Sequence, residues 1–238
     1  MSMKKRKQLT AVGLVLAILC LIFMALRHQT YQPSTLASNS ASKATISRNF
    51  TEFKGLSTKP LVIFYPGALV EPNSYSIWAQ QLSKHGYRVA IAHFPMDFAL
   101  LAVNRADQYS QKTPYVIGGH SLGGVCAARY ANKHQKQKNL KGVFFLASYA
   151  DQKGNLSKTK LPVLQVTATN DGVIKKSRLK QNAKYLPQTT TKKVIKGGNH
   201  AGFGSYGAQK GDKKATISNA SQQRQVAQLL LAWLAKIK

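Results

Sequence analysis

YVIGGHSLGG, residues 115–124, determines the fold class more than any other part of the chain. It joins an apolar run to a serine in the pattern G-x-S-x-G, and a helical pattern follows over residues 122–134. A serine at such a tight strand-to-helix turn is forced into a strained backbone conformation that exposes its hydroxyl. The residues two before and two after it must be small, because strand and helix pass close together there. The decapeptide therefore predicts a nucleophile elbow made of Gly119, His120, Ser121, Leu122 and Gly123.

Apolar runs and helical patterns alternate along the chain on both sides of this elbow. Strands are expected at residues 61–65, 89–94, 115–118, 142–147, 163–167 and 193–195. Helices are expected at residues 75–85, 98–109 and 122–134, and over the C-terminal apolar pattern with Ser218 or Ser221 as its N-cap. This alternation predicts an α/β fold with an open, mostly parallel sheet covered by helices on both faces. In such sheets the active site lies at the carboxyl ends of the strands.

A nucleophilic serine needs a general base and an acid that orients the base. Among the six histidines, His200 lies in a glycine-rich loop between the last strand and the last helix, from which it can reach across the sheet. Among the seven acidic residues, Asp151 and Asp171 both follow late strands. The chain order Ser121, Asp171, His200 is typical of a serine elbow on such a sheet. It favours Asp171 as the acid, with Asp151 as the alternative.

An oxyanion hole needs two backbone N–H donors beside the serine. Leu122, directly after Ser121, supplies one of them. The second is expected from the loop after the first strand, residues 66–69, where Gly67 allows a sharp turn and Ala68 is the predicted donor.

The charge of the chain is strongly positive. Thirty-five Lys and Arg face seven Asp and Glu, which gives a net charge of +28. This excess favours contact with an anionic cell wall or anionic lipid. The lysines are spread over loops and helix faces without an arginine-and-aromatic stripe, so no specific nucleic-acid partner is expected. The two cysteines, Cys20 and Cys126, are not expected to pair, and no metal-ligand spacing appears, so neither a metal nor a cofactor is expected.

The N-terminal part predicts a membrane anchor. Residues 1–8 form a basic cytoplasmic segment, residues 9–26 an apolar signal anchor long enough to span a bilayer, and residues 27–48 a flexible stalk rich in small polar residues. Residues 49–238 then form the folded domain outside the cell. The alternative is a cleaved signal peptide with a cut near residues 37–41, which would release a secreted domain.

Several motifs together resemble one known family. YPGALVEPNSY, GGHSLGG, FFLASYAD, TNDGV and GGNHAGFGSYG are similar to the small α/β-hydrolases related to dienelactone hydrolases, the α/β-hydrolase fold-5 group, over about residues 60–238. The resemblance implies Ser121 as nucleophile, Asp171 as acid and His200 as base. Dienelactone hydrolases themselves use a cysteine at the position of Ser121, which argues against their specific reaction.

Together with the predicted anchor, the resemblance implies an extracytoplasmic serine hydrolase of the carboxylesterase type that acts on small acyl substrates. The short connection between residues 147 and 163 leaves no room for a cap domain, which predicts an open site. Two alternatives use the same fold. An acyltransferase would pass the acyl group to an alcohol instead of water, and a catalytically idle module would only bind an anionic wall or surface.

Overall fold

The computed structural model of the chain describes residues 29–56, 58–110 and 113–237, together with residues 3, 5, 12–14, 17 and 24. The chain forms two units, Met1–Thr30 and Tyr31–Lys238. The second unit carries the sheet and every site discussed below.

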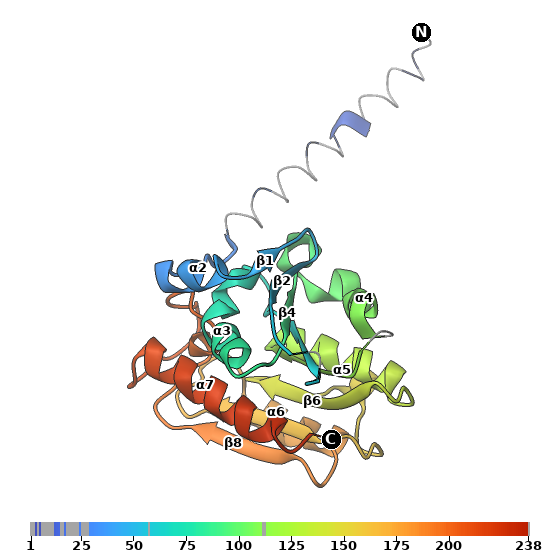
Figure 1. Cartoon of the computed structure of the whole chain (residues 1–238). Helices are drawn as coiled ribbons and strands as arrows, with labels where there is room; N and C mark the ends of the chain where they lie inside the picture. Colours follow the sequence, from blue (N-terminus) through green and yellow to red (C-terminus); the bar gives the residue numbers. More distant parts are fainter. Residues whose placement is uncertain are drawn as a thin grey trace. The chain divides into compact units, whose positions relative to one another are not determined.

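An eight-stranded sheet runs through the second unit, in the order β1-β2-β4-β3-β5-β6-β7-β8 (Figure 1). The strands from β4 to β8 pair in parallel, and β2 runs antiparallel to both β1 and β4. The predicted α/β fold with a mostly parallel sheet is therefore confirmed. The strand bounds are β1 Thr45–Ile46, β2 Phe50–Phe53, β3 Leu61–Tyr65, β4 Val89–Ala92, β5 Tyr115–His120, β6 Leu140–Leu146, β7 Val163–Ala168 and β8 Thr191–Ile195.

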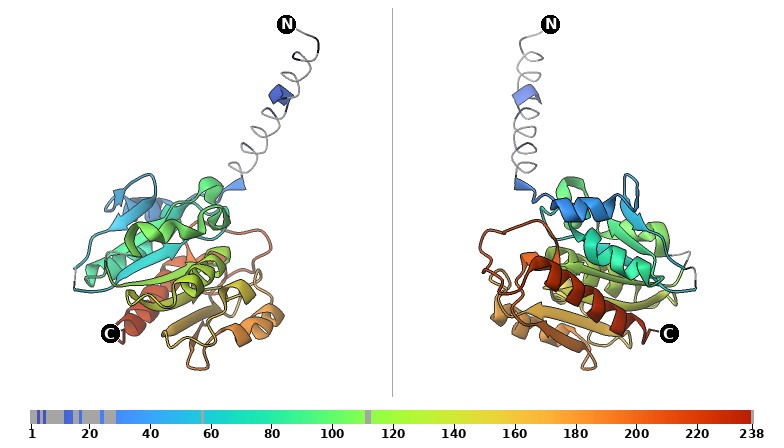
Figure 2. Two further views of the ribbon diagram at one scale, coloured as in Figure 1. Left: turned by 90° about the vertical axis from the view of Figure 1, so that its right-hand side faces the viewer. Right: turned by 60° about the vertical axis from the view of Figure 1, so that its left-hand side comes forward.

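Helices cover both faces of this sheet. Figures 1 and 2 show α3 and α7 together on one face and α5 on the opposite face. The α-helices are α2 Thr35–Ala41, α3 Ser76–Lys84, α4 Asp107–Ser110, α5 Leu122–His134, α6 Lys176–Asn182 and α7 Asn219–Leu234. The 3₁₀ helices are η1 Pro72–Tyr75, η2 Pro95–Asp97, η3 Ala99–Ala106, η4 Gln152–Gly154, η5 Ala183–Tyr185 and η6 Ala201–Phe203.

Alternate side chains of each central strand enter two separate apolar cores. In β3, Val62 and Phe64 pack on the side of α3 and α7, whereas Leu61, Ile63 and Tyr65 pack on the side of α5. Successive side chains of a strand point to opposite faces, so a strand buried on both faces must be apolar throughout. The continuous run LVIFY is typical of such a central strand for this reason.

The predicted stalk, residues 27–48, is folded from Tyr31 onward. Ser34 caps helix α2, whose buried Ala37 and Ala41 lie one turn apart. The backbone N–H of Ser34 donates to Ser205 O at 2.7 Å. The richness in serine and alanine resembles a linker, but these small side chains let α2 pack against α3. The folded unit therefore begins at Tyr31 rather than at residue 49.

The predicted fold class also included an N-terminal transmembrane helix, and that part is wrong for the described residues. Among them, no helix has the length and apolar character needed to cross a bilayer. Within the range 9–26, the described residues are 12–14, 17 and 24. The remainder of that range lies outside the described residues.

Candidate active site

Ser121 lies at the junction of β5 and α5 with a left-handed backbone, at φ 51° and ψ −124°. Its backbone N–H donates to Leu146 O at 3.1 Å, so the turn is tied to strand β6. Its carbonyl accepts a hydrogen bond from Ser148 Oγ at 2.6 Å. A non-glycine residue in this conformation is strained and persists only where the surroundings fix it. The backbone thus forms the sharp turn expected of the elbow, with Ser121 partly exposed to solvent.

Two glycines make this turn possible, because without a Cβ atom they let the backbone segments pass close to each other. A Cβ atom at Gly123 would lie 2.1 Å from both Tyr65 O and Pro66 O. A Cβ atom at Gly119 would lie 2.5 Å from the carbonyl carbon of Gly123. The first turn of α5 thus passes against the ends of β3 and β5, which leaves space only for glycine at both positions.

Asp171 and His200 are in direct contact. His200 Nδ1 lies 2.9 Å from Asp171 Oδ2, and both side chains are almost fully buried. The other carboxylate oxygen of Asp171 accepts the backbone N–H groups of Val173 at 2.9 Å and Ile174 at 2.8 Å. Since Asp171 follows β7 and His200 follows β8, two neighbouring parallel strands deliver the pair to the same edge of the sheet.

Ser121 makes no hydrogen bond to Asp171 or His200, and its chain neighbour His120 is the residue that contacts His200. The ring of His120, the residue before Ser121, lies 4.4 Å from the ring of His200 between centroids. Nε2 of His200 is buried and has no hydrogen-bond partner in the described part of the chain. A buried ring nitrogen without a partner is costly and calls for a functional explanation.

The two predicted oxyanion donors lie on adjoining elements, because β3 and β5 pair in register up to Tyr65 and Gly119. In the loop after β3, Gly67 N donates to Tyr75 Oη at 3.0 Å, and Leu69 N donates to Asp97 O at 3.0 Å. Between them, the N–H of Ala68 has no protein acceptor among the described residues. The N–H of Leu122 likewise has none there.

A buried hydrogen-bonded chain connects the elbow to that loop, and no local sequence signal indicates it. Tyr75 Oη accepts from Gly67 N and lies 2.9 Å from His120 Nδ1. Burial, and next the charge of neighbouring His200, lower the pKa of His120 well below its ordinary value. His120 is therefore neutral and carries a single ring proton, and its Nδ1 shares a hydrogen bond with the Tyr75 hydroxyl.

Asp151, the alternative acid, lies outside this constellation. Its carboxylate pairs with Arg129 and caps η4 by accepting Gly154 N at 2.9 Å. It therefore serves the local packing of η4 on α5. No group of three or more His, Cys, Asp or Glu side chains that could hold a metal ion occurs among the described residues.

A pocket of about 380 Å³ opens beside Ser121. Its apolar walls come from the start of α5 and from the segment after Asp171, and two cations from the start of α6 complete it. The lining residues are Ser121, Leu122, Val125, Tyr149, Val173, Ile174, Lys175 and Arg178.

Comparisons with known proteins agree with this architecture. The model of the family described as the alpha/beta hydrolase family matches residues 61–224. Among solved structures, a monoacylglycerol lipase of Paleococcus ferrophilus is similar with a TM-score of 0.59 at 14% identity, over 79% of this chain and 100% of that one. A thermophilic esterase of Thermogutta terrifontis is similar with a TM-score of 0.56 at 14% identity, over 82% of this chain and 97% of that one. No curated protein matches the chain.

Proposed function

This chain belongs to the alpha/beta hydrolase family, and from that premise we propose that it is a serine hydrolase that cleaves carboxylic esters or similar acyl substrates. The family match confirms the predicted hydrolase, whereas the finer relation to dienelactone hydrolases stays a prediction. The observation that carries the proposal is the buried contact of His200 with Asp171 near the strained turn of Ser121. That arrangement is typical of a Ser-His-Asp triad.

The proposed reaction proceeds in two halves. His200 Nε2 takes the hydroxyl proton of Ser121 as Oγ attacks the acyl carbonyl, and the N–H groups of Leu122 and Ala68 stabilise the oxyanion. The intermediate collapses to an acyl-enzyme while His200 gives the proton to the leaving alcohol. Water then attacks the acyl carbon and gives a proton to His200, which returns it to Ser121 as the acid departs. Asp171 holds the ring of His200 and stabilises its charged form.

The surroundings of Ser121 favour small or surface-presented acyl groups. The connection from β6 to β7 contains only the short η4, so nothing in that described segment forms a cap over the site. The pocket of about 380 Å³ is at the lower end of the range for small-molecule sites. These features support short-chain esters as substrates.

Lys175 and Arg178 at the pocket favour substrates that also carry an anionic group. Both side chains are exposed, and neither has an ion-pair partner in the described part of the chain. A carboxylate or phosphate on the acyl substrate would find two cations beside the apolar walls of Leu122 and Ile174. The proposed substrate class is therefore a small ester with an anionic substituent.

Hydrolysis of p-nitrophenyl acetate and butyrate by the full chain tests this function. Wild type and Ser42→Ala, in which an exposed serine on the surface is removed, should turn over both esters alike. Ser121→Ala should lower kcat by several orders of magnitude with the fold intact. Turnover by Ser121→Ala at the wild-type rate would contradict the proposal.

A further inference from the structure

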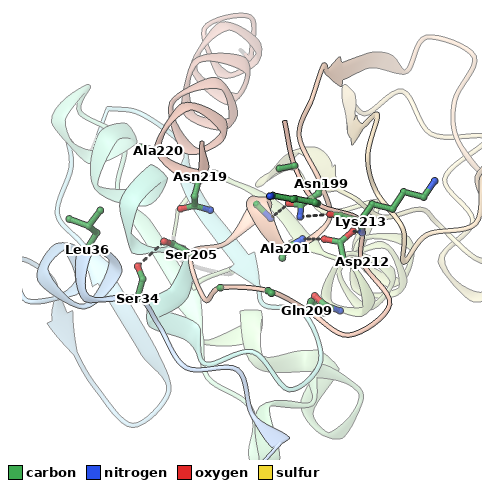
Figure 3. Close-up of a pocket in the computed structure, with 15 residues that line it drawn as sticks. Ser34, Leu36, Asn199, Ala201, Ser205, Gln209, Asp212, Lys213, Asn219 and Ala220 are labelled. Carbon is green, nitrogen blue, oxygen red and sulfur yellow. Dashed lines mark hydrogen bonds between the residues drawn. The ribbon is translucent and has the colours of Figure 1, made fainter. Parts of the chain in front are cut away.

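The segment 212–214 contacts both loops that carry the proposed acid and base. It lies between η6 and α7, and most of its surroundings are exposed. Figure 3 shows Asp212 directed toward Ala201 and Lys213 beside Asn199.

The carboxylate of Asp212 bridges the two loops. Its Oδ2 accepts the backbone N–H of Ala201, the residue after His200, at 2.8 Å. Its Oδ1 accepts the backbone N–H of Gly172, the residue after Asp171, at 2.9 Å. The carboxylate of Asp212 thus binds both the residue after Asp171 and the residue after His200.

Two asparagines complete a symmetric arrangement. Asn199 Nδ2, from the residue before His200, donates to Lys213 O at 2.8 Å. Asn170 Nδ2, from the residue before Asp171, donates to Lys214 O at 3.0 Å. Asp171 and His200 are therefore each flanked on both sides by hydrogen bonds to the segment 212–214.

The segment has no buried apolar side chain, because Asp212 is half-buried and Lys213 and Lys214 are exposed. At the nearby Gly207 and Gly211, both with positive φ, an added Cβ atom would meet no atom within 4 Å. Asn199, Ala201, Asp212 and Lys213 also line an open pocket of about 610 Å³ (Figure 3), so the segment borders solvent rather than a packed core.

A role in the local turn alone does not account for the contacts of Asp212. Such a turn would explain only the bond from Lys213 N to Asp212 Oδ1. The bonds to Gly172 and Ala201 reach 40 and 11 positions away.

We infer that Asp212 is a positioning residue, whose carboxylate fixes the loops of Asp171 and His200 relative to each other so that their hydrogen bond keeps its catalytic geometry. The expected effect on turnover rests on the proposed function. The coupling of the two loops by Asp212 is independent of that function. Asp212 lines no part of the pocket beside Ser121, so its role is orientation of the base and not substrate binding.

The test compares the full chain with Asp212→Ala and Asp212→Asn. The alanine removes both long-range acceptors, whereas the asparagine keeps one carbonyl oxygen and loses the second. We expect kcat for a short ester to fall on the order of 10- to 100-fold in Asp212→Ala, with KM within about twofold. The kcat of Asp212→Asn should lie between the values of wild type and Asp212→Ala. The matched control is Asp107→Asn, a half-exposed carboxylate that bonds Tyr130 on α5, and it should keep the wild-type kcat.

Two structural readouts keep the inference testable without turnover. Amide exchange at Gly172 and Ala201 should be about tenfold faster in Asp212→Ala than in wild type. The Nδ1 proton signal of His200 should broaden or disappear in that variant and persist in Asp107→Asn. An inactive wild type would end the proposed function, and these readouts would still decide the role of Asp212. The inference fails if Asp212→Ala keeps both the exchange rates and the His200 signal. It also fails if only thermal stability falls while kcat stays that of wild type.

Discussion

His200 Nδ1 lies 2.9 Å from Asp171 Oδ2, although the two residues are 29 positions apart in the chain. The neighbouring parallel strands β7 and β8 end at the same edge of the sheet, and the two residues follow those ends. The second oxygen of Asp171 is held by two backbone N–H groups, so the carboxylate cannot rotate away from the ring. This contact fixes which ring nitrogen of His200 faces Asp171, and Nε2 has no hydrogen-bond partner among the described residues.

Replacing the acid should therefore disable the base without unfolding the domain. In Asp171→Asn the amide group no longer stabilises a charged ring and favours the wrong tautomer of His200. We expect kcat to fall on the order of 10³- to 10⁴-fold, as measured by steady-state hydrolysis of a short ester. Asp151→Asn, the other acid that follows a late strand, serves as control because its carboxylate caps η4 away from the site. A larger loss in Asp151→Asn than in Asp171→Asn would mean that the acid has been misassigned.

Gly123→Ala should damage both stability and activity. The new methyl group would lie 2.1 Å from Tyr65 O and Pro66 O, and backbone oxygens cannot move aside as side chains do. We expect the free energy of unfolding to fall by about 2–4 kcal/mol in urea titrations, with a loss of activity because α5 must shift away from β3. Gly207→Ala, where the methyl group meets no atom within 4 Å, should cost only about 1 kcal/mol for its positive φ. Equal losses of unfolding free energy in the two variants would show that the close approach of α5 to β3 does not require glycine at position 123.

The buried His120 should make stability fall in mild acid. Burial, followed by the charge of His200, lowers its pKa well below the ordinary 6.5. Below pH 6.5 the unfolded chain binds a proton at this histidine that the folded chain does not bind. The free energy of unfolding therefore decreases as the pH falls below 6.5, by up to about 1.4 kcal/mol per pH unit, and is independent of this group above that pH.

Urea titrations between pH 7.5 and pH 5 measure this effect. His120→Gln should be less stable than wild type at pH 7.5 but should lose less stability on acidification. Some slope should persist because burial also lowers the pKa of His93. An unchanged slope in His120→Gln would mean that His120 is not buried in its neutral form.

The cations beside the pocket should select for anionic esters. Arg178→Glu should raise KM for a succinate monoester on the order of tenfold at low ionic strength, and leave KM for the uncharged butyrate ester unchanged. The difference should shrink in 1 M salt, where the Debye length is about 3 Å. Arg224→Glu changes charge equally on the exposed surface of α7 and serves as control. Equal shifts for both esters, or equal shifts in both variants, would contradict selection by Arg178.

The central strands and the candidate site are predictable from the sequence because both have local signals. The run LVIFY is apolar on both faces, the glycines around Ser121 indicate a close approach, and Asp171 and His200 follow late strands. Chain order and the position after a late strand favour these two side chains, with Asp151 as the alternative acid, and the structure places Asp171 and His200 in contact. Their catalytic roles stay a prediction until they are measured.

The features that the sequence does not predict depend on tertiary contacts. Helix α2 consists mostly of small residues, and the burial of its alanines against α3 cannot be inferred from composition. Helix α6 has lysines and no apolar period, so no pattern indicates it. Asp212 resembles a turn residue, since nothing local reveals that its carboxylate reaches two distant loops. The cellular location of the chain likewise stays a prediction.

Labelling of the full chain with a fluorophosphonate probe decides whether Ser121 is a nucleophile, because only an activated serine reacts with the probe at a useful rate. We expect wild type and Ser42→Ala to be labelled on the peptide that contains Ser121. We also expect Ser121→Ala to remain unlabelled, and His200→Ala to react slower by several orders of magnitude. A folded wild type that remains unlabelled, or a Ser121→Ala variant labelled as fast as wild type, would contradict the proposed serine hydrolase.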